Sequence, residues 1–360
     1  MAEDLFTPYI QQLPPGVAGN YDEDEVLALN GSLEDIIAKG WTFHDFCSFS
    51  KDSLIFWTPD ASIVSYLDPP SHHNYTVDMI FPPTSSSKKK TLHIAAVNSE
   101  ATAPVLTSLL AFFIASHMDE QEMEIIFKAF ATNPRKDFGG LDFSTSSLLA
   151  KTLGNSSCHI SLSFQFMTLS PSQCQAIFSS RGLYSIEFRQ CTTSEGLGES
   201  LHSCKPGFGP QKLRISCTQQ EFATIAEGLR DNSSLTELEL QLHFIFNDDD
   251  MQRITAALQC QEMESLVLEY LDMDDDGWSL LCKALGEHSK IRTVTLAFTD
   301  KFADAARRLT PERRRTRSEA ILNLVQTSPT IQELNWPEFQ QDESLGPVIQ
   351  KQLEEKRGRN

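Results

Sequence analysis

The segment from Met263 to Lys290, MESLVLEYLDMDDDGWSLLCKALGEHSK, decides the fold of this chain. Apolar residues stand at Met263, Leu266 and Leu268, and the last two, spaced by two, lie on one face of a short strand. An Asp-rich turn follows, whose charges favour a helix N-terminus. Apolar residues then recur at the spacing of one helical face, at Trp278, Leu281, Cys282 and Leu285. The segment is therefore predicted to form a strand, a turn and a helix.

The same pattern recurs along the C-terminal half of the chain. LTELELQ begins at Leu235, MESLVLE at Met263, IRTVTLA at Ile291 and IQELNWP at Ile331. The first three of these anchor residues are 28 residues apart, and the last step is 40. A fixed period of this size is typical of a solenoid, in which each repeat buries its apolar face only against its neighbours.

Weaker copies of the strand pattern extend toward the N-terminus. Their apolar positions fall in TLHIAAV (91–97), FGGLDFS (138–144), SCHISLS (157–163), LYSIEFRQC (183–191) and QKLRISC (211–217). Helical segments fit between them. Together the copies predict an α/β chain with about seven or eight parallel strands and helices along the outside.

The segment 263–290 resembles the ribonuclease-inhibitor type of leucine-rich repeat. It matches the pattern LxxLxLxxNxLxxxGxxxLxxxLxxxxx, with Gly277 and Leu281 near their expected places. The chain departs from the family after the strand, where an Asn or Cys is expected. Only Cys191 fits there, since the later repeats place His243, Leu271 and Thr299 at that position. The resemblance implies a horseshoe-shaped solenoid of divergent repeats, with a parallel concave sheet and outer helices.

Three parts are predicted along the chain. Residues 1–20 are polar and are expected to be disordered. Residues 21–88, with a helix over 22–39 and the strand-like pieces SLIFW and TVDMIF, form a cap, a degenerate repeat or a separate module. SSSKKK reads as a flexible loop before the first strand. Residues 89–360 form the solenoid, with a basic insertion at about 301–317.

Composition narrows the partners and the compartment. Acidic residues outnumber basic ones by 49 to 30, and the resulting charge of −19 disfavours nucleic acid and anionic membranes. The N-terminus lacks a secretory signal pattern. The apolar stretch 103–116 is too short to cross a bilayer and is expected to be a buried helix. Eight scattered cysteines without a CxxC pair predict reduced thiols in a cytoplasmic or nuclear protein, which we expect to be a monomer.

Catalytic and metal-binding signatures are missing from the sequence. It contains no GxSxG, GxGxxG, GxxxxGK[ST] or HExxH motif. The run from Asp272 to Gly277 resembles the start of a calcium loop, but Lys283 stands where the loop needs a bidentate Glu. We therefore predict a protein that is not an enzyme and that has no catalytic residue, metal or cofactor.

The concave face is the predicted docking surface. The resemblance implies that side chains between the apolar strand positions project from it and bind a protein partner. The residues so placed are Glu187, Arg189, Arg214, Glu237, Glu239, Glu269, Thr295, Glu333 and Asn335. Their mainly acidic character favours a basic partner and steered association. A branch of this repeat family activates small GTPases, so a GTPase regulator is an alternative, which would need an Arg at the concave rim.

The basic segment KFADAARRLTPERRRTR falls in the long step between the last two anchors. We expect its extra residues to bulge from the solenoid as a loop. Its cations suit a nuclear-import signal, an RNA or phosphate contact, or an acidic partner, but a solvated loop with a helical charged face is the favoured interpretation. No aromatic residue stands among the arginines, which disfavours a single-stranded nucleic-acid platform. The basic residues are Lys301, Arg307, Arg308, Arg313, Arg314, Arg315 and Arg317.

Overall fold

The computed structural model divides the chain into two compact units. The N-terminal unit comprises Met1–Thr193 and Gly207–Pro210, and the C-terminal unit comprises Ser194–Pro206 and Gln211–Asn360. Their boundary falls within the range assigned to repeats from the sequence. The residues described are 47–50, 53–56, 77–80, 89–95, 110–111, 114–115, 122–128, 136–137, 143, 147–193, 196–205, 207–259, 263–269, 273–297, 310–337 and 341–358.

The N-terminal unit contains a sheet that changes from antiparallel to parallel. Its strand order is β1 (Cys47–Ser50), β2 (Ser53–Phe56), β3 (Val77–Ile80), β4 (Lys89–Ala95), β5 (Glu122–Lys128), β7 (His159–Gln165) and β9 (Leu183–Arg189). Pairing is antiparallel from β1 to β4 and parallel from β4 to β9. The short strands β6 (Lys136–Asp137) and β8 (Met167–Thr168) form a separate parallel pair. The described helices are α7 (Leu148–Asn155) and α8 (Pro171–Phe178).

Several sequence predictions are confirmed in this unit and one is wrong. SLIFW, TVDMIF, TLHIAAV, SCHISLS and LYSIEFRQC each overlap a strand. FGGLDFS was expected to supply the ladder strand before SCHISLS, but β5 pairs directly with both β4 and β7, so no place is left for it. Phe143 is buried outside any strand. The predicted helix at 22–39 and most of SSSKKK lie outside the described residues, and the last two lysines of SSSKKK begin β4.

Aromatic side chains stack across neighbouring strands in the core of this unit. The ring of Phe164 lies 5.0 Å from that of Phe127 and 5.5 Å from that of Phe188. The turns after β7 and β9 repeat one another, since Phe166 and Gln190 both have positive φ. Cys191 donates from its Sγ to the carbonyl of Phe164 at 3.2 Å. The Cys191 side chain thus satisfies a backbone carbonyl of the neighbouring strand β7.

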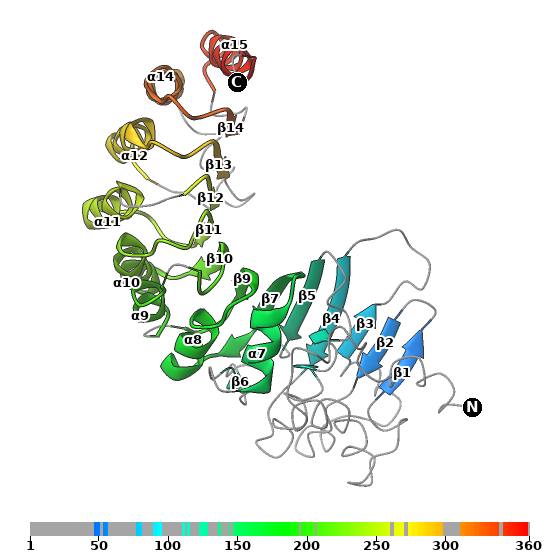
Figure 1. The fold of residues 1–360 in the computed structure, drawn as a ribbon. Coiled ribbons are helices and arrows are strands. Elements are labelled where there is room, and N and C mark those ends of the chain that lie inside the picture. Colours follow the sequence, from blue (N-terminus) through cyan, green and yellow to red (C-terminus); the bar gives the residue numbers. More distant parts are fainter. Residues whose placement is uncertain are drawn as a thin grey trace, which may run out of the picture. The chain divides into compact units, whose positions relative to one another are not determined.

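The C-terminal unit repeats one strand and one helix along a parallel ladder. Its strands are β10 (Lys212–Cys217), β11 (Glu237–Leu242), β12 (Ser265–Glu269), β13 (Thr293–Ala297) and β14 (Glu333–Asn335). The helices lie on one side of this ladder (Figure 1). They are α9 (Gly196–His202), α10 (Gln219–Arg230), α11 (Asp248–Gln259), α12 (Asp275–Glu287), α14 (Pro311–Thr327) and α15 (Gly346–Arg357).

The register of this ladder confirms the repeat found in the sequence. Leu238, Leu266, Val294 and Leu334, each three residues after an anchor, pair in one continuous row. The 40-residue step keeps this register, so its extra residues lie between the strands and leave the core unshifted. Alternation along each strand buries one side chain and leaves the next half-exposed. The architecture is α/β with an open parallel sheet, compatible with a solenoid.

Helix starts follow the residues that the sequence marked. Thr218 and Glu221 form a capping box at α10, and Asp274 accepts from Gly277 N at 2.7 Å at α12. The Asp-rich turn before α12 therefore caps its helix as predicted, satisfying an N–H group that has no partner within the helix. Buried inner faces dock these helices on the ladder, through residues such as Ile225, Leu258, Leu285 and Val325.

Helix α15 closes the end of the described ladder. Arg357 donates from Nε to the carbonyl of Gln332 at 2.8 Å, just before β14. The edge strand β14 is only three residues long, and a short edge strand is a poor template for pairing with another chain. Among the helices described, none is long and apolar enough to cross a membrane.

Candidate protein-docking surface

The side of the C-terminal ladder opposite the helices presents a polar surface, which we call the open strand face. Each of its side chains is half-exposed or exposed and alternates with buried side chains along its strand. Its residues are Lys212, Arg214, Ser216, Glu237, Glu239, Gln241, Ser265, Val267, Glu269, Thr293, Thr295, Ala297, Glu333 and Asn335. Seven of them were predicted from the sequence: Arg214, Glu237, Glu239, Glu269, Thr295, Glu333 and Asn335.

Ion pairs neutralise the first two strands of this face. Lys212 and Glu237 are direct partners in the β10–β11 register, and so are Arg214 and Glu239. The Lys212 Nζ lies 3.0 Å from a Glu237 carboxylate oxygen, and the Arg214 Nε lies 2.6 Å from one of Glu239. Sequence reasoning missed Lys212, although its position two before Arg214 places it on the same face. The acidic character predicted for these two strands is therefore balanced.

The carboxylates on the remaining strands are arranged differently. Glu269 accepts from Gln241 Nε2 at 2.7 Å, a neutral donor that leaves its negative charge in place. Glu333 lies 4.0 Å from Arg357, with both side chains about half exposed. Asn335 donates to the Thr295 hydroxyl at 3.4 Å. The net negative charge of the open strand face is thus carried by β12 and β14.

The other two predicted docking residues belong to the N-terminal unit. Glu187 is nearly buried on β9 and accepts from the hydroxyl of Ser163 at 2.9 Å. Arg189 is half exposed, and its Nε lies 2.6 Å from the Glu187 carboxylate. These two residues form a closed polar cluster with Ser163.

The described part of the basic segment is helical from Pro311 onward. Residues 311–317 form the first turns of α14, because Thr310 caps the helix and Pro311 at the first position has no N–H to leave unpaired. The prediction of a bulging loop is therefore wrong for this part. Lys301, Arg307 and Arg308 lie outside the described residues.

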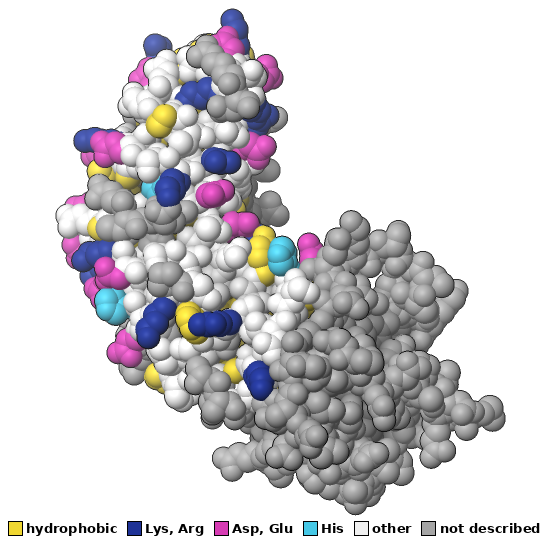
Figure 2. All heavy atoms as spheres, viewed as in Figure 1, with side chains coloured by type: hydrophobic (Ala, Val, Ile, Leu, Met, Phe, Trp, Pro, Cys, Tyr) yellow, Lys and Arg dark blue, Asp and Glu magenta, His cyan; other side chains and the backbone are white. Residues whose placement is uncertain are grey.

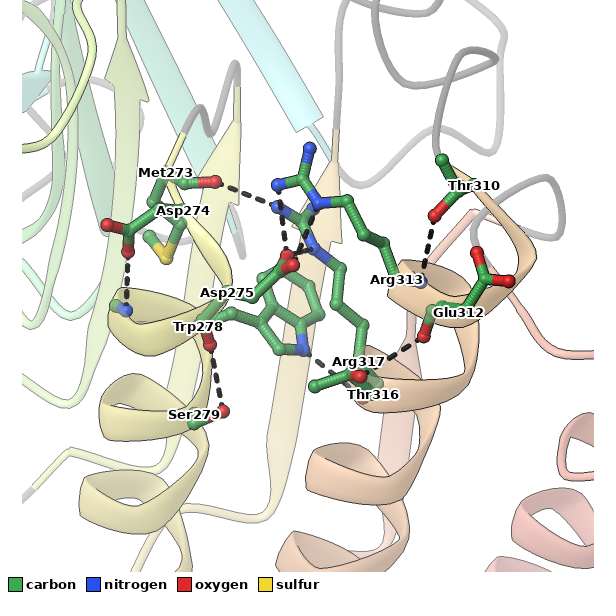
Figure 3. A network of polar contacts seen from close by, with 11 residues as sticks. Met273, Asp274, Asp275, Trp278, Ser279, Thr310, Glu312, Arg313, Thr316 and Arg317 are labelled. Atoms are coloured by element: carbon green, nitrogen blue, oxygen red, sulfur yellow. Dashed lines mark hydrogen bonds and ion pairs between the residues drawn. The ribbon is translucent and has the colours of Figure 1, made fainter.

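Two of the arginines in α14 form ion pairs with the same carboxylate (Figure 3). Arg313 contacts both oxygens of Asp275, at 2.8 and 3.1 Å. Arg317 is buried, with its Nε 2.8 Å from the same carboxylate and its Nη2 2.8 Å from the carbonyl of Met273. Its guanidinium also lies 5.1 Å from the ring centre of Trp278. This network was not predicted from the sequence. It engages Arg313 and Arg317, two of the cations that were predicted to bind a partner.

The other two described arginines of this segment differ from that pair. Arg315 is exposed and lies 3.0 Å from Glu319 one turn later in the helix. Arg314 is half-buried. In the space-filling view, cationic and anionic side chains are interspersed over the described part of the C-terminal unit (Figure 2). The coloured side chains on this face form no large patch of a single sign.

Buried thiols and capping carboxylates leave little reactive chemistry in the part of the chain that the structure describes. Burial raises the pKa of Cys174 to about 12, and that of Cys282 to about 12, which keeps both thiols protonated and unreactive. Four further cysteines, Cys158, Cys191, Cys204 and Cys217, are buried as well. No group of three or more His, Cys, Asp or Glu side chains within the described ranges could hold a metal ion.

No protein-family model matches this chain, and no curated protein matches it.

Proposed function

We propose that this protein is a non-catalytic scaffold that binds another protein on the open strand face. We further propose that its repeats are divergent leucine-rich repeats of the ribonuclease-inhibitor-like type, arranged as a horseshoe with a concave sheet. The observation that supports both is the unbroken register of β11 to β14 across steps of 28, 28 and 40 residues. A ladder so regular presents its outward side chains in straight rows.

The open strand face combines a rigid backing with adaptable polar groups. Behind each row stand fully buried leucines, such as Leu240 and Leu266, which fix the strands against the helices. On the outward side stand hydroxyl, amide and carboxylate groups. These groups hydrogen-bond to water and can exchange those hydrogen bonds for ones to another protein. Binding groups held on strands are positioned more precisely than groups on loops. The geometry therefore favours recognition over chemistry.

No specific observation favours either alternative function, the GTPase regulator or the nucleic-acid contact. A GTPase regulator needs an arginine available to a nucleotide, but Arg189 and Arg214 each lie 2.6 Å from a carboxylate of their own sheet. A nucleic-acid contact through the basic segment needs available cations, but Arg313 and Arg317 are held by Asp275. We therefore propose neither.

Site-specific photo-crosslinking tests the docking surface. A photoreactive residue would replace Thr295 on the open strand face, or Leu280 on α12 as a matched control, since its side chain is 41% exposed among the helices. We expect a discrete adduct with one protein from position 295 in cells and none from position 280. An adduct from both positions, or from neither, contradicts docking on this face.

A further inference from the structure

The charge distribution on the open strand face identifies the partner's chemistry more closely. Resting on the proposed function, we infer that β12 to β14 receive a cationic segment of the partner, whose Lys or Arg side chains pair with Glu269 and Glu333. The first two strands take no part in this charge recognition, because their carboxylates already have cations beside them.

The inference begins with the pairing within the ladder. Glu237 and Glu239 lie against Lys212 and Arg214, side chain to side chain in register. A partner cation at β11 would compete with a cation that is already in place. At β12 the situation is reversed, since Glu269 is oriented by the amide of Gln241 and keeps its full charge. A partner cation there gains an ion pair without displacing one.

The surroundings of Glu269 and Glu333 contain no cation on the strands themselves. The outward side chains of β12 to β14 are otherwise Ser265, Val267, Thr293, Thr295, Ala297 and Asn335. Among the described cations near this group, Arg292 is exposed one residue before β13, and its carbonyl accepts from the backbone N–H of Glu333. Arg357 lies 4.0 Å from the Glu333 carboxylate and is about half exposed. At that distance and exposure an ion pair contributes little, so Glu333 remains attractive to a second cation.

The size of the surface indicates a segment and not a whole globular face. Strand spacing of about 4.8 Å and a rise of about 3.3 Å per residue make the described face roughly 19 Å by 16 Å. A stable interface between two globular proteins covers about 800 Å² on each partner, well above this area. A single helix is about 10 Å across and fits within it.

The two carboxylates set the spacing of the cations. Glu269 and Glu333 are separated by two strand spacings and about four residues along the ladder, which corresponds to roughly 16 Å. Lysines about eleven residues apart on one face of a helix span this distance. A helical peptide with that pair of lysines is therefore the appropriate probe, with the same peptide carrying two glutamates as its control.

Peptide binding by the full chain, followed by fluorescence anisotropy at two salt concentrations, tests the inference. The variant Glu269→Lys/Glu333→Lys should bind the lysine peptide at least about tenfold more weakly and with a smaller salt dependence. The matched control is Glu227→Lys/Glu287→Lys, which changes the net charge equally at exposed positions of α10 and α12. Circular dichroism would show that both variants fold, and Glu269→Gln/Glu333→Gln provides a milder second pair.

The outcomes separate this inference from the proposed function. Loss of affinity only in the strand variants, together with crosslinking of the peptide from position 295, supports both. Crosslinking from position 295 with equal losses in the strand and helix variants overturns the assignment of Glu269 and Glu333 but leaves docking on the face intact. Peptide binding without any crosslink from position 295 overturns the inference and places the cationic site elsewhere.

Discussion

The guanidinium of Arg317 on α14 lies 2.8 Å from the carboxylate of Asp275 on α12. The Arg317 side chain is 6% exposed and that of Asp275 is 26% exposed, so this ion pair is largely withdrawn from water. The indole Nε1 of Trp278 donates to the Arg317 carbonyl at 3.3 Å, which adds a second link between the helices. The longest step of the repeat is thus anchored on one acidic side chain.

Removing that carboxylate should destabilise the C-terminal unit. In Asp275→Asn the cation of Arg317 stays buried without an opposite charge, and we expect the free energy of unfolding to fall by about 2–4 kcal/mol. Arg315→Ala, which breaks only an exposed pair with Glu319, should change it by less than about 1 kcal/mol. Urea unfolding measures both, and equal effects would show that Asp275 does not anchor α14.

The same carboxylate should make stability depend on acid. Burial raises the pKa of Asp275, but the hydrogen bonds and charges of Arg313 and Arg317 outweigh burial and hold the pKa of the carboxyl below its ordinary value. Because the folded pKa is lowered, the stabilisation is complete above the unfolded pKa of about 3.9 and is lost as pH falls through the folded value.

Urea unfolding from pH 6 down to pH 2.5 checks this dependence. The wild type and Asp275→Asn should differ most above about pH 5, and the difference should narrow as the pH falls below 4. Glu312 and Asp342 also have lowered pKa values, but they are present in both proteins, so their contributions cancel in the difference. A difference that stays constant over the whole range contradicts the role assigned to the Asp275 charge.

The sequence predicted the C-terminal repeat well because apolar spacing determines it. Residues such as Leu266 and Leu268 reveal the strand, and Leu281 and Leu285 the helix, without knowledge of any contact. The strand β5 was missed although Met123, Ile125 and Phe127 alternate in the same way. FGGLDFS was expected to be the strand instead, because Leu141 and Phe143 show the same apolar spacing. Local sequence alone does not distinguish between two segments with the same spacing.

The charge pattern of the open strand face could be predicted only in part. Alternation along each strand identifies Glu237 and Glu239 as outward-facing, and that expectation is confirmed by their exposure. Their partners Lys212 and Arg214 stand 25 residues earlier, a step that differs from the 28-residue period, so the register joining them was not evident. Arg317 illustrates the same limit, since burial of a cation depends on a carboxylate 42 residues away.

A further repeated contact lies just before three of the strands. The side chains of Asn232, His288 and Ser328 each accept hydrogen bonds from the backbone N–H groups two and three residues later. All three are buried and stand three residues before an anchor. Three different residue types perform one task there, which is why no sequence motif marks the position.

Substitution at His288 tests this contact. His288→Ala leaves the N–H groups of Lys290 and Ile291 without their acceptor, and we expect a loss of about 1–3 kcal/mol in the free energy of unfolding. His288→Asn should recover most of that loss, because Asn232 makes the same contact in the segment between α10 and β11. Thermal unfolding compares them, and an Asn variant as unstable as the Ala variant contradicts a role in accepting these hydrogen bonds.

Two glycines give opposite predictions for the same substitution. A Cβ added at Gly228 on α10 would lie 2.1 Å from the carbonyl oxygen of Gly198 on α9, so the two helices touch backbone to backbone. Gly154 on α7 is exposed, and a Cβ there would meet the Cβ of Arg181 at an ordinary 3.6 Å.

Gly228→Ala should therefore lower the free energy of unfolding by about 1–3 kcal/mol, because the overlap outweighs the better helix propensity of alanine. Gly154→Ala should raise it by about 0.5–1 kcal/mol, because only the propensity changes. Calorimetry of both variants measures the two signs directly. Gly154 and Gly228 belong to different units. Where the two units give separate unfolding transitions, each substitution should shift the transition temperature of its own unit. Stabilisation by alanine at position 228 would mean that α9 and α10 are not in contact at these glycines.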